Sequence, residues 1–224
     1  MFSDTMEDYL KAIYVLQTEG GPPVSTSEIA EYLEKTPPTV TSMVSSLAEN
    51  DLIDHEKYNG VELTAEGETV ALEVIRHHRL LETYLTEHLD YEWHEVHEEA
   101  DALEHHISEE FERRVADALD NPTVDPHGDP IPGVDLDPIE GDDADRLTEF
   151  AVGDHVVVSR VSDRDEAELT YLEAAGITPG TELELTDIAP FGMITVETVD
   201  GDEQSLPESV ARSIRVEPVD EAVA

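Results

Sequence analysis

Apolar side chains recur at helical spacing near the start of the chain. They predict a helix over residues 4–18, with Met6, Tyr9, Leu10, Ile13 and Leu16 on its buried side. Ser25 and Glu28 form a capping-box pattern, which predicts a short helix beginning beside them. Thr36 before Pro37 is typical of another helix start, because proline in the first turn loses no hydrogen bond. The sequence therefore predicts two short helices in succession after the first.

The last of these helices has one apolar and one small polar face. Its buried side is predicted to hold Val40, Met43, Val44 and Leu47. The opposite face is uncharged until Glu49 and consists of Pro38, Thr39, Thr41, Ser42, Ser45 and Ser46. Asn59-Gly60, between the apolar segments 52–53 and 61–63, is a strong hairpin signal. Together these features predict a winged helix-turn-helix over residues 1–66, and a helical bundle with an incidental hairpin is the alternative.

The periodicity changes along the rest of the chain. Thr64 is predicted to cap a long helix that ends near Leu89, and helix is expected again from Trp93 to about Leu119 with a break near Ser108. Pro, Gly and Asp without periodicity predict a linker, followed by strands at 155–161, 182–188, 193–198 and 214–217 and a short helix at 166–175. The predicted fold class is mainly α with a small β-barrel: a helical domain at 67–122, the linker at 123–146 and the barrel at 147–218.

The charge of the chain is extreme and evenly spread. Acidic residues number 55 against 12 basic ones, for a formal charge of −43, yet 39% of the residues are hydrophobic and periodic, which argues against disorder. Only Lys11, Lys35 and Lys57 are lysines, as expected for the surface of a protein from a salt-loving organism. No apolar stretch approaches a membrane span and no leader is recognisable, so a cytoplasmic location is expected. The absence of cysteine excludes disulfides and thiolate chemistry.

Residues 97–106, HEEADALEHH, suggest a metal site. Seven of the ten histidines lie between positions 77 and 106. On a helix, the side chains of His97, Asp101, Glu104 and His105 would project along one side. Imidazole with carboxylate suits Mn, Fe, Co, Ni or Zn. A merely solvated acidic helix is the alternative interpretation.

Winged helix, histidine-rich helices, linker and small barrel, in this order, resemble the diphtheria toxin repressor family of iron- and manganese-dependent transcriptional regulators. The matching segments are MEDYLKAIY at 6–14, TVTSMVSSL at 39–47, RHHRLLE at 76–82, HEEADALEHH at 97–106 and PHGDPIP at 126–132. The acidic composition indicates a haloarchaeal-type member. The resemblance implies that the C-terminal barrel is SH3-like, similar to iron-transport accessory proteins.

The resemblance also implies two metal sites in each subunit. The primary site would use Asp8, Asp101, Glu104 and His105, and the ancillary site would use His78, Glu82, His97, Asp165 and Glu168. Iron-type members have methionine and cysteine where this chain has Asp8 and Asp101, whereas manganese-type members have carboxylates. Hard oxygen donors favour Mn(II), with Fe(II) as the alternative. Manganese-type members have a glutamate where this chain has Lys11, and a lysine ammonium does not ligate, so no closely spaced metal pair is expected here.

The function implied is a metal-dependent regulator, a repressor of metal uptake and homeostasis genes, that binds a palindromic operator as a homodimer. The predicted DNA contacts are Lys35, Thr36, Pro38, Thr39, Thr41, Ser42, Ser46 and Lys57. Residues 1–66 hold 13 acidic and 3 basic side chains, a charge of −10, so hydrogen bonds and shape must replace phosphate attraction. A metal-independent winged-helix regulator and a metallohydrolase are the rival hypotheses. No catalytic motif such as HExxH accompanies the predicted ligands, so neither an enzyme nor a small organic ligand is expected.

Overall fold

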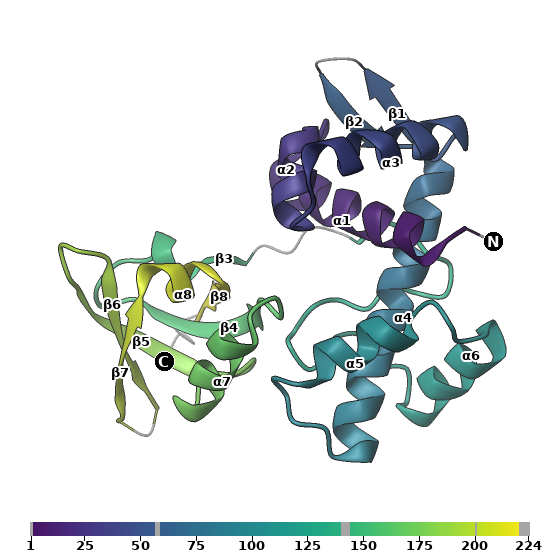
Figure 1. Cartoon of the computed structure of the whole chain (residues 1–224). Coiled ribbons are helices and arrows are strands. Elements are labelled where there is room, and N and C mark those ends of the chain that lie inside the picture. Colours follow the sequence, from purple (N-terminus) through teal and green to yellow (C-terminus); the bar gives the residue numbers. More distant parts are fainter. Residues whose placement is uncertain (1, 57–58, 140–143, 200, 220–224) are drawn as a thin grey trace. The chain divides into compact units, whose positions relative to one another are not determined.

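The chain forms two compact units in a computed structural model (Figure 1). The structure describes residues 2–56, 59–139, 144–199 and 201–219. The first unit comprises residues 1–81, 101–123 and 131–141, and the second comprises 82–100, 124–130 and 142–224. Lys57, one of the predicted DNA contacts, lies outside the described residues.

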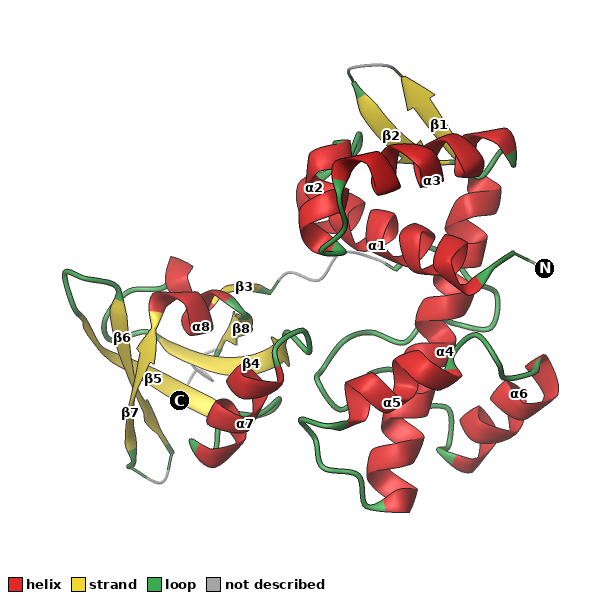
Figure 2. Cartoon of the chain, viewed as in Figure 1, coloured by secondary structure: helices red, strands yellow, loops and turns green. Residues whose placement is uncertain are grey.

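The first unit begins with the predicted winged helix-turn-helix. Its elements are α1 (Asp4–Gly20), α2 (Thr26–Tyr32), α3 (Pro37–Glu49), β1 (Ile53–Glu56) and β2 (Gly60–Leu63). The capping box is confirmed, because the Ser25 hydroxyl accepts from the Glu28 amide and the Glu28 carboxylate accepts from the Ser25 amide. Strands β1 and β2 pair antiparallel to form the wing, which Figure 2 shows in yellow above α3.

A single apolar core joins the helices of this domain. Buried residues of α1, including Leu10 and Ile13, share it with Val40 and Val44 of α3 and with Val61 of the wing. Met43, predicted to be buried, is only half-buried and packs at the edge of the core. Because close-packed interiors resist small distortions, α1 and α3 are expected to move as one body.

The central helices are α4 (Ala65–Leu89), α5 (Val96–Leu103) and α6 (Glu109–Ala118). Helix α4 matches the prediction, and the predicted break is present, with Ser108 as the N-cap of α6. However, α5 already ends at Leu103, and Glu104 to His106 form a turn in which the His106 amide donates to the Leu103 carbonyl. The prediction that one helix face presents all the metal-binding side chains was therefore wrong: Glu104 and His105 lie on a turn after the helix.

The predicted linker packs against the protein instead of hanging free. Within its described residues no helix or strand forms before β3 (Asp145–Arg146). Ile131 is buried, and Ile139 packs on the first core while its amide donates to the Tyr14 hydroxyl at 3.0 Å. The lack of apolar periodicity in this segment therefore indicated irregular backbone that packs on the protein.

The second unit contains the small antiparallel sheet domain. Its elements are β4 (His155–Val161), α7 (Glu166–Ala174), β5 (Glu182–Ile188), β6 (Met193–Thr198), β7 (Glu203–Pro207), α8 (Glu208–Arg212) and β8 (Ile214–Pro218), in the strand order β3-β8-β4-β5-β6-β7, with a 3-10 turn at Leu147–Glu149. The four predicted strands are confirmed, whereas β7 and α8 were not predicted because their sequences are short and largely polar. Trp93, from the connection between α4 and α5, is buried in the same core as the sheet. Among the described helices, none has the length and apolar character needed to span a bilayer.

Candidate metal centres and DNA-reading face

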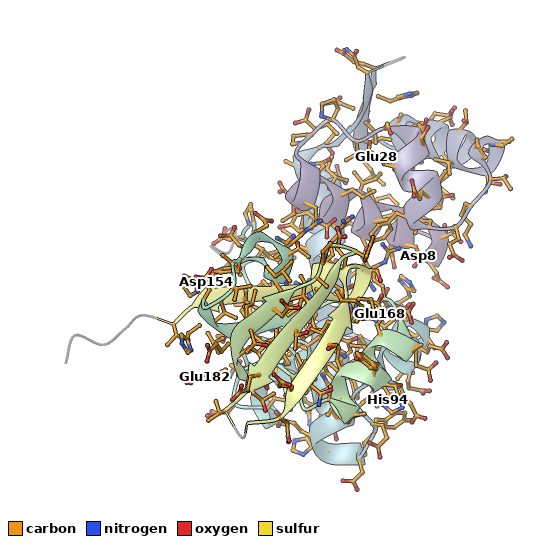
Figure 3. All side chains as sticks on the ribbon, turned by 90° about the vertical axis from the view of Figure 1, so that its left-hand side faces the viewer. Asp8, Glu28, His94, Asp154, Glu168 and Glu182 are labelled. Atoms are coloured by element: carbon orange, nitrogen blue, oxygen red, sulfur yellow. The ribbon has the colours of Figure 1, made fainter. Side chains whose placement is uncertain are left out.

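The first candidate metal centre joins α1 to the turn after α5. His105 Nε2 lies 2.9 Å from Asp8 Oδ1 and 3.4 Å from Glu104 Oε1. Asp8, labelled in Figure 3, belongs to α1, and the other two belong to the turn at 104–106. One oxygen or nitrogen of each residue lies within 4.8 Å of the others. Donors at that spacing can reach a common first-row divalent ion, and two carboxylates with one imidazole form a suitable set for Mn(II) or Fe(II).

Burial and charge oppose one another in the first centre. The side chain of Glu104 is 1% exposed and that of His105 is 7% exposed, whereas Asp8 remains 48% exposed. Burial raises the pKa of Asp8, and the hydrogen bond to His105 only partly offsets this effect. Burial lowers the pKa of His105, but hydrogen bonds and charges from Glu7, Glu104 and Asp8 outweigh burial and raise it overall. The carboxylates of the cluster therefore favour a positive charge beside them.

Glu7 also contacts His105, and the sequence did not predict this contact. Glu7 Oε2 lies 2.7 Å from Nδ1 of His105, on the side of the ring opposite Asp8. A carboxylate on one ring nitrogen fixes the orientation of the imidazole and increases the basicity of the other nitrogen. The only feature of the sequence that could have indicated this role is that Glu7 is next to Asp8. Adjacent side chains on a helix point about 100° apart, so the sequence alone argues against a shared site.

Lys11 occupies a second cluster in the first unit. Its Nζ lies 2.9 Å from Glu104 Oε2, 3.0 Å from Asp101 Oδ1 and 3.1 Å from His78 Nδ1. Burial lowers the pKa of Lys11, but the Glu104 and Asp101 carboxylates outweigh burial and hold it above its usual value. Asp101, predicted to bind the primary metal, therefore lies with His78 beside the ammonium group in this structure, while Glu104 faces both clusters.

A further cluster lies in the second unit, where His97 Nδ1 is 3.2 Å from both Glu82 Oε1 and Asp163 Oδ2. Glu82 is fully buried, and His78 lies one turn before it on α4. Asp163 was not predicted, since several carboxylates follow β4 and the sequence does not distinguish them.

Neither barrel residue predicted for the ancillary site belongs to this cluster among the described residues. Asp165 caps α7, because its Oδ1 accepts from the amides of Ala167 and Glu168. Glu168, labelled in Figure 3, lies in the first turn of that helix. The structure therefore brings Asp163 to His97, where the sequence suggested Asp165 and Glu168.

The predicted DNA-reading residues share the outer face of α3. Pro38, Thr39, Thr41 and Ser42 are exposed, Ser46 is half-exposed, and Lys35 and Thr36 lie exposed just before the helix. The Thr41 hydroxyl donates to the Pro37 carbonyl at 2.9 Å, and the Ser45 hydroxyl donates to the Thr41 carbonyl at 2.9 Å. These oxygens keep lone pairs free to accept hydrogen bonds, for example from the amino groups of adenine or cytosine.

Three known protein families match successive parts of the chain. Residues 1–61 match the N-terminal DNA-binding domain of iron-dependent repressors, residues 64–133 match their metal-binding and dimerisation domain, and residues 146–218 match the FeoA domain. The fold class predicted from the sequence is therefore confirmed.

Full-length relatives show the same similarity. The chain is 37% identical to the iron-dependent repressor IdeR of Mycobacterium tuberculosis, over 96% of this chain and 98% of that protein. It is 36% identical to the diphtheria toxin repressor of Corynebacterium efficiens, over 97% and 96%.

Solved structures extend the comparison. A manganese-dependent transcriptional repressor in complex with manganese is 38% identical, with a TM-score of 0.88, over 96% of this chain and 100% of that one. ScaR with bound Zn²⁺ is 34% identical, with a TM-score of 0.81, over 96% and 99%. The chain belongs to the iron-dependent repressor family, whose members include the diphtheria toxin repressor.

Proposed function

We propose that this protein is a metal-dependent transcriptional repressor of metal uptake and homeostasis genes. It binds a palindromic operator as a homodimer when Mn(II) or Fe(II) is held by Asp8, Glu104 and His105. The relatives named above are repressors, and one of the matched domains is described as a metal-binding and dimerisation domain.

The observation on which this proposal rests is the contact between Asp8 and His105, residues 97 positions apart. Asp8 lies on α1, which shares its core with α3, and His105 lies beyond α5. A cation bound by both residues favours the conformation in which they meet, and so fixes α1 and the DNA-reading helix relative to the central helices. Metal binding then increases the population of the DNA-competent conformation.

The donor set supports Mn(II) as the first candidate metal and Fe(II) as the second. Asp8 and Asp101 supply oxygen where a softer metal would prefer sulfur, and the chain contains no cysteine. Asp101 is half-exposed beside Lys11, and we propose that it completes the first centre by turning toward Asp8.

We propose a second metal centre made by His78, Glu82 and His97, with Asp163 as the ligand from the C-terminal domain. The 3.2 Å contacts of His97 with Glu82 and Asp163 support this set. Asp165 and Glu168 are replaced in the proposal, because the Asp165 carboxylate is already bonded to two amides of α7.

The Glu82→Gln variant is expected to lose one bound Mn(II) per subunit and to keep the other. The amide has the same shape as the carboxylate but lacks the charge that a divalent ion requires. Metal content after equilibrium dialysis measures this directly. Glu87→Gln, an exposed position on the same helix, is the matched control, and unchanged metal content in Glu82→Gln would contradict the second centre.

The DNA-reading proposal follows from the uncharged face of α3. Thr39, Thr41, Ser42 and Ser46 are proposed to bond base edges or phosphates, and Pro38 to contact a thymine methyl group. Lys35, Thr36 and Lys57 are proposed to contact the backbone. With so few cations, the protein is expected to depend on shape and hydrogen bonds.

Operator binding should depend on metal. Duplexes selected from a random pool by the Mn(II)-loaded protein are expected to bind tightly with Mn(II) or Fe(II) and weakly in a chelator, in fluorescence anisotropy at high KCl. Binding that ignores metal would favour a metal-independent regulator. Hydrolytic turnover without DNA binding would favour a metallohydrolase.

We also propose that the protein works in the salt-rich cytoplasm of a haloarchaeal-type cell. The formal charge of −43 supports this, because such self-repulsion destabilises a compact fold unless salt screens it. Folding that is equally stable in 0.1 M and 3 M KCl would contradict the proposal.

A further inference from the structure

We propose that His127 is a positioning residue for the second metal centre: the turn at Pro126–Asp129 places its imidazole behind Glu82 and directs the other carboxylate oxygen toward His97. This inference rests on the second centre proposed above. It gives a role to residues 126–129, PHGD, none of which belongs to the first centre or to the proposed DNA contacts.

The two oxygens of Glu82 face different partners in the second unit. Oε1 lies 3.2 Å from Nδ1 of His97, whereas Oε2 lies 3.7 Å from Nδ1 of His127. The side chains of Glu82 and His127 are both 0% exposed. The other ring nitrogen of His127 lies 3.0 Å from the carbonyl oxygen of Trp93 and donates to it. The imidazole therefore lies between a buried carboxylate and a buried backbone carbonyl, and it is hydrogen-bonded to the carbonyl.

Three carboxylates act on the imidazole of His127 within the second unit. Burial lowers the pKa of His127, but Glu82, with Asp125 and Asp163, outweighs burial and raises it to about 9. Glu82, Asp125 and His127 each place one ligand atom within 4.8 Å of the others, and the Glu82 oxygen that faces His127 is not the oxygen that faces His97.

The turn that holds His127 is anchored from several sides. Asp125 Oδ1 accepts from the amides of His127 at 2.8 Å and Asp129 at 2.9 Å. The His127 carbonyl accepts from the Val161 amide at 2.9 Å, at the end of β4. Such anchoring limits the freedom of the ring, as a positioning role requires.

Close packing fixes the turn against β4 as well. Gly128 has φ of +89°, and a Cβ there would lie 2.0 Å from the Ser159 carbonyl oxygen, so a side chain is excluded. Arg160 forms an ion pair with Asp129 at 3.0 Å. Asp163 follows two residues after the end of β4, so one turn positions both Glu82 and the segment that carries Asp163.

Two substitutions separate positioning from packing. His127→Gln keeps a donor for the Trp93 carbonyl but removes the ring nitrogen that faces Glu82, whereas His127→Asn keeps a donor facing Glu82 and loses the bond to Trp93. We expect His127→Gln to weaken Mn(II) binding at the second centre by about 10–100-fold, as is usual for a partner of a metal ligand, and His127→Asn to weaken it less. The first centre should bind as in the wild type.

Calorimetric titration of the full-length protein with Mn(II) at high KCl, together with unfolding in chelator, tests the inference. If Glu82→Gln retains both metals, the proposed second centre fails. If Glu82→Gln loses one metal but His127→Gln binds as the wild type does, the centre stands and the positioning role is overturned. If both His127 variants lose Mn(II) affinity in the same proportion as they lose stability in chelator, His127 serves only packing and the inference is overturned.

Discussion

Replacing Asp8 with alanine is expected to abolish the metal-dependent gain in operator affinity while the dimer persists. Asp8 is the ligand that we propose α1 contributes to the first centre, whereas the other two proposed ligands, Glu104 and His105, lie on the turn after α5. Without it, a metal bound by those two residues no longer distinguishes one position of α1 from another. A ligand that binds two conformations equally shifts nothing.

The expected change equals the whole allosteric coupling between metal binding and operator binding. Allosteric coupling is typically worth about a 5–150-fold change in affinity, and in Asp8→Ala this factor should fall to about one. Fluorescence anisotropy with and without Mn(II) measures it, and light scattering measures the dimer. Asp4→Ala, an exposed carboxylate in the first turn of the same helix, is the matched control. Full metal-dependent binding by Asp8→Ala would refute the proposed coupling.

Replacing Lys11 with methionine is expected to destabilise the metal-free protein more than the same change at the exposed Lys35. The ammonium group pairs with Glu104, whose side chain is 1% exposed, and with Asp101, while 20% of Lys11 itself is exposed. Removing one partner of a buried pair costs about 3–5 kcal/mol. Because Lys11 is partly exposed and His78 still contacts the Glu104 carboxylate, the expected loss lies near the lower end.

Metal should reverse much of this loss. Without the ammonium group, no lysine charge neutralises the cluster of His78, Asp101 and Glu104. Its nitrogen and oxygen donors lie close enough together to bind a divalent ion in its place. Denaturant unfolding of Lys11→Met in chelator and in excess Mn(II) should therefore show a larger stabilisation by metal than in the wild type. Lys11→Arg, which keeps the charge, and Lys35→Met, at an exposed lysine, are the controls. Wild-type stability of Lys11→Met in chelator would disprove the role of Lys11.

Most of the fold was predictable because its signals are local. The capping box at Ser25 and Glu28, the prolines at the start of α3 and the alternation in β4 each depend on residues only a few positions apart. Strand β7 was not predicted because its sequence, EQSLP, does not alternate clearly between apolar and polar residues. Its pairing with β6 makes it a strand, and pairing depends on a partner that the local sequence does not contain.

The candidate sites were predictable as sets of residues, but not as geometry. The histidines and carboxylates of the EHH segment indicated a metal, and the family resemblance assigned Asp8 to it. The choice between Asp163 and Asp165 could not be made, because whether a carboxylate caps a helix or faces an imidazole depends on where the backbone turns. In this protein Asp165 meets two amides of α7, and Asp163 meets His97.

The sequence by itself determined the kind of protein: a winged helix, a histidine-rich helical segment and a small barrel, with oxygen and nitrogen donors and no sulfur from cysteine. Tertiary structure alone decided which charges meet. It placed Glu7 behind His105, Lys11 between Asp101 and Glu104, and His127 behind Glu82. The reason is physical: periodicity is a property of neighbouring residues, whereas the partner of a buried charge is set by packing between segments distant in sequence.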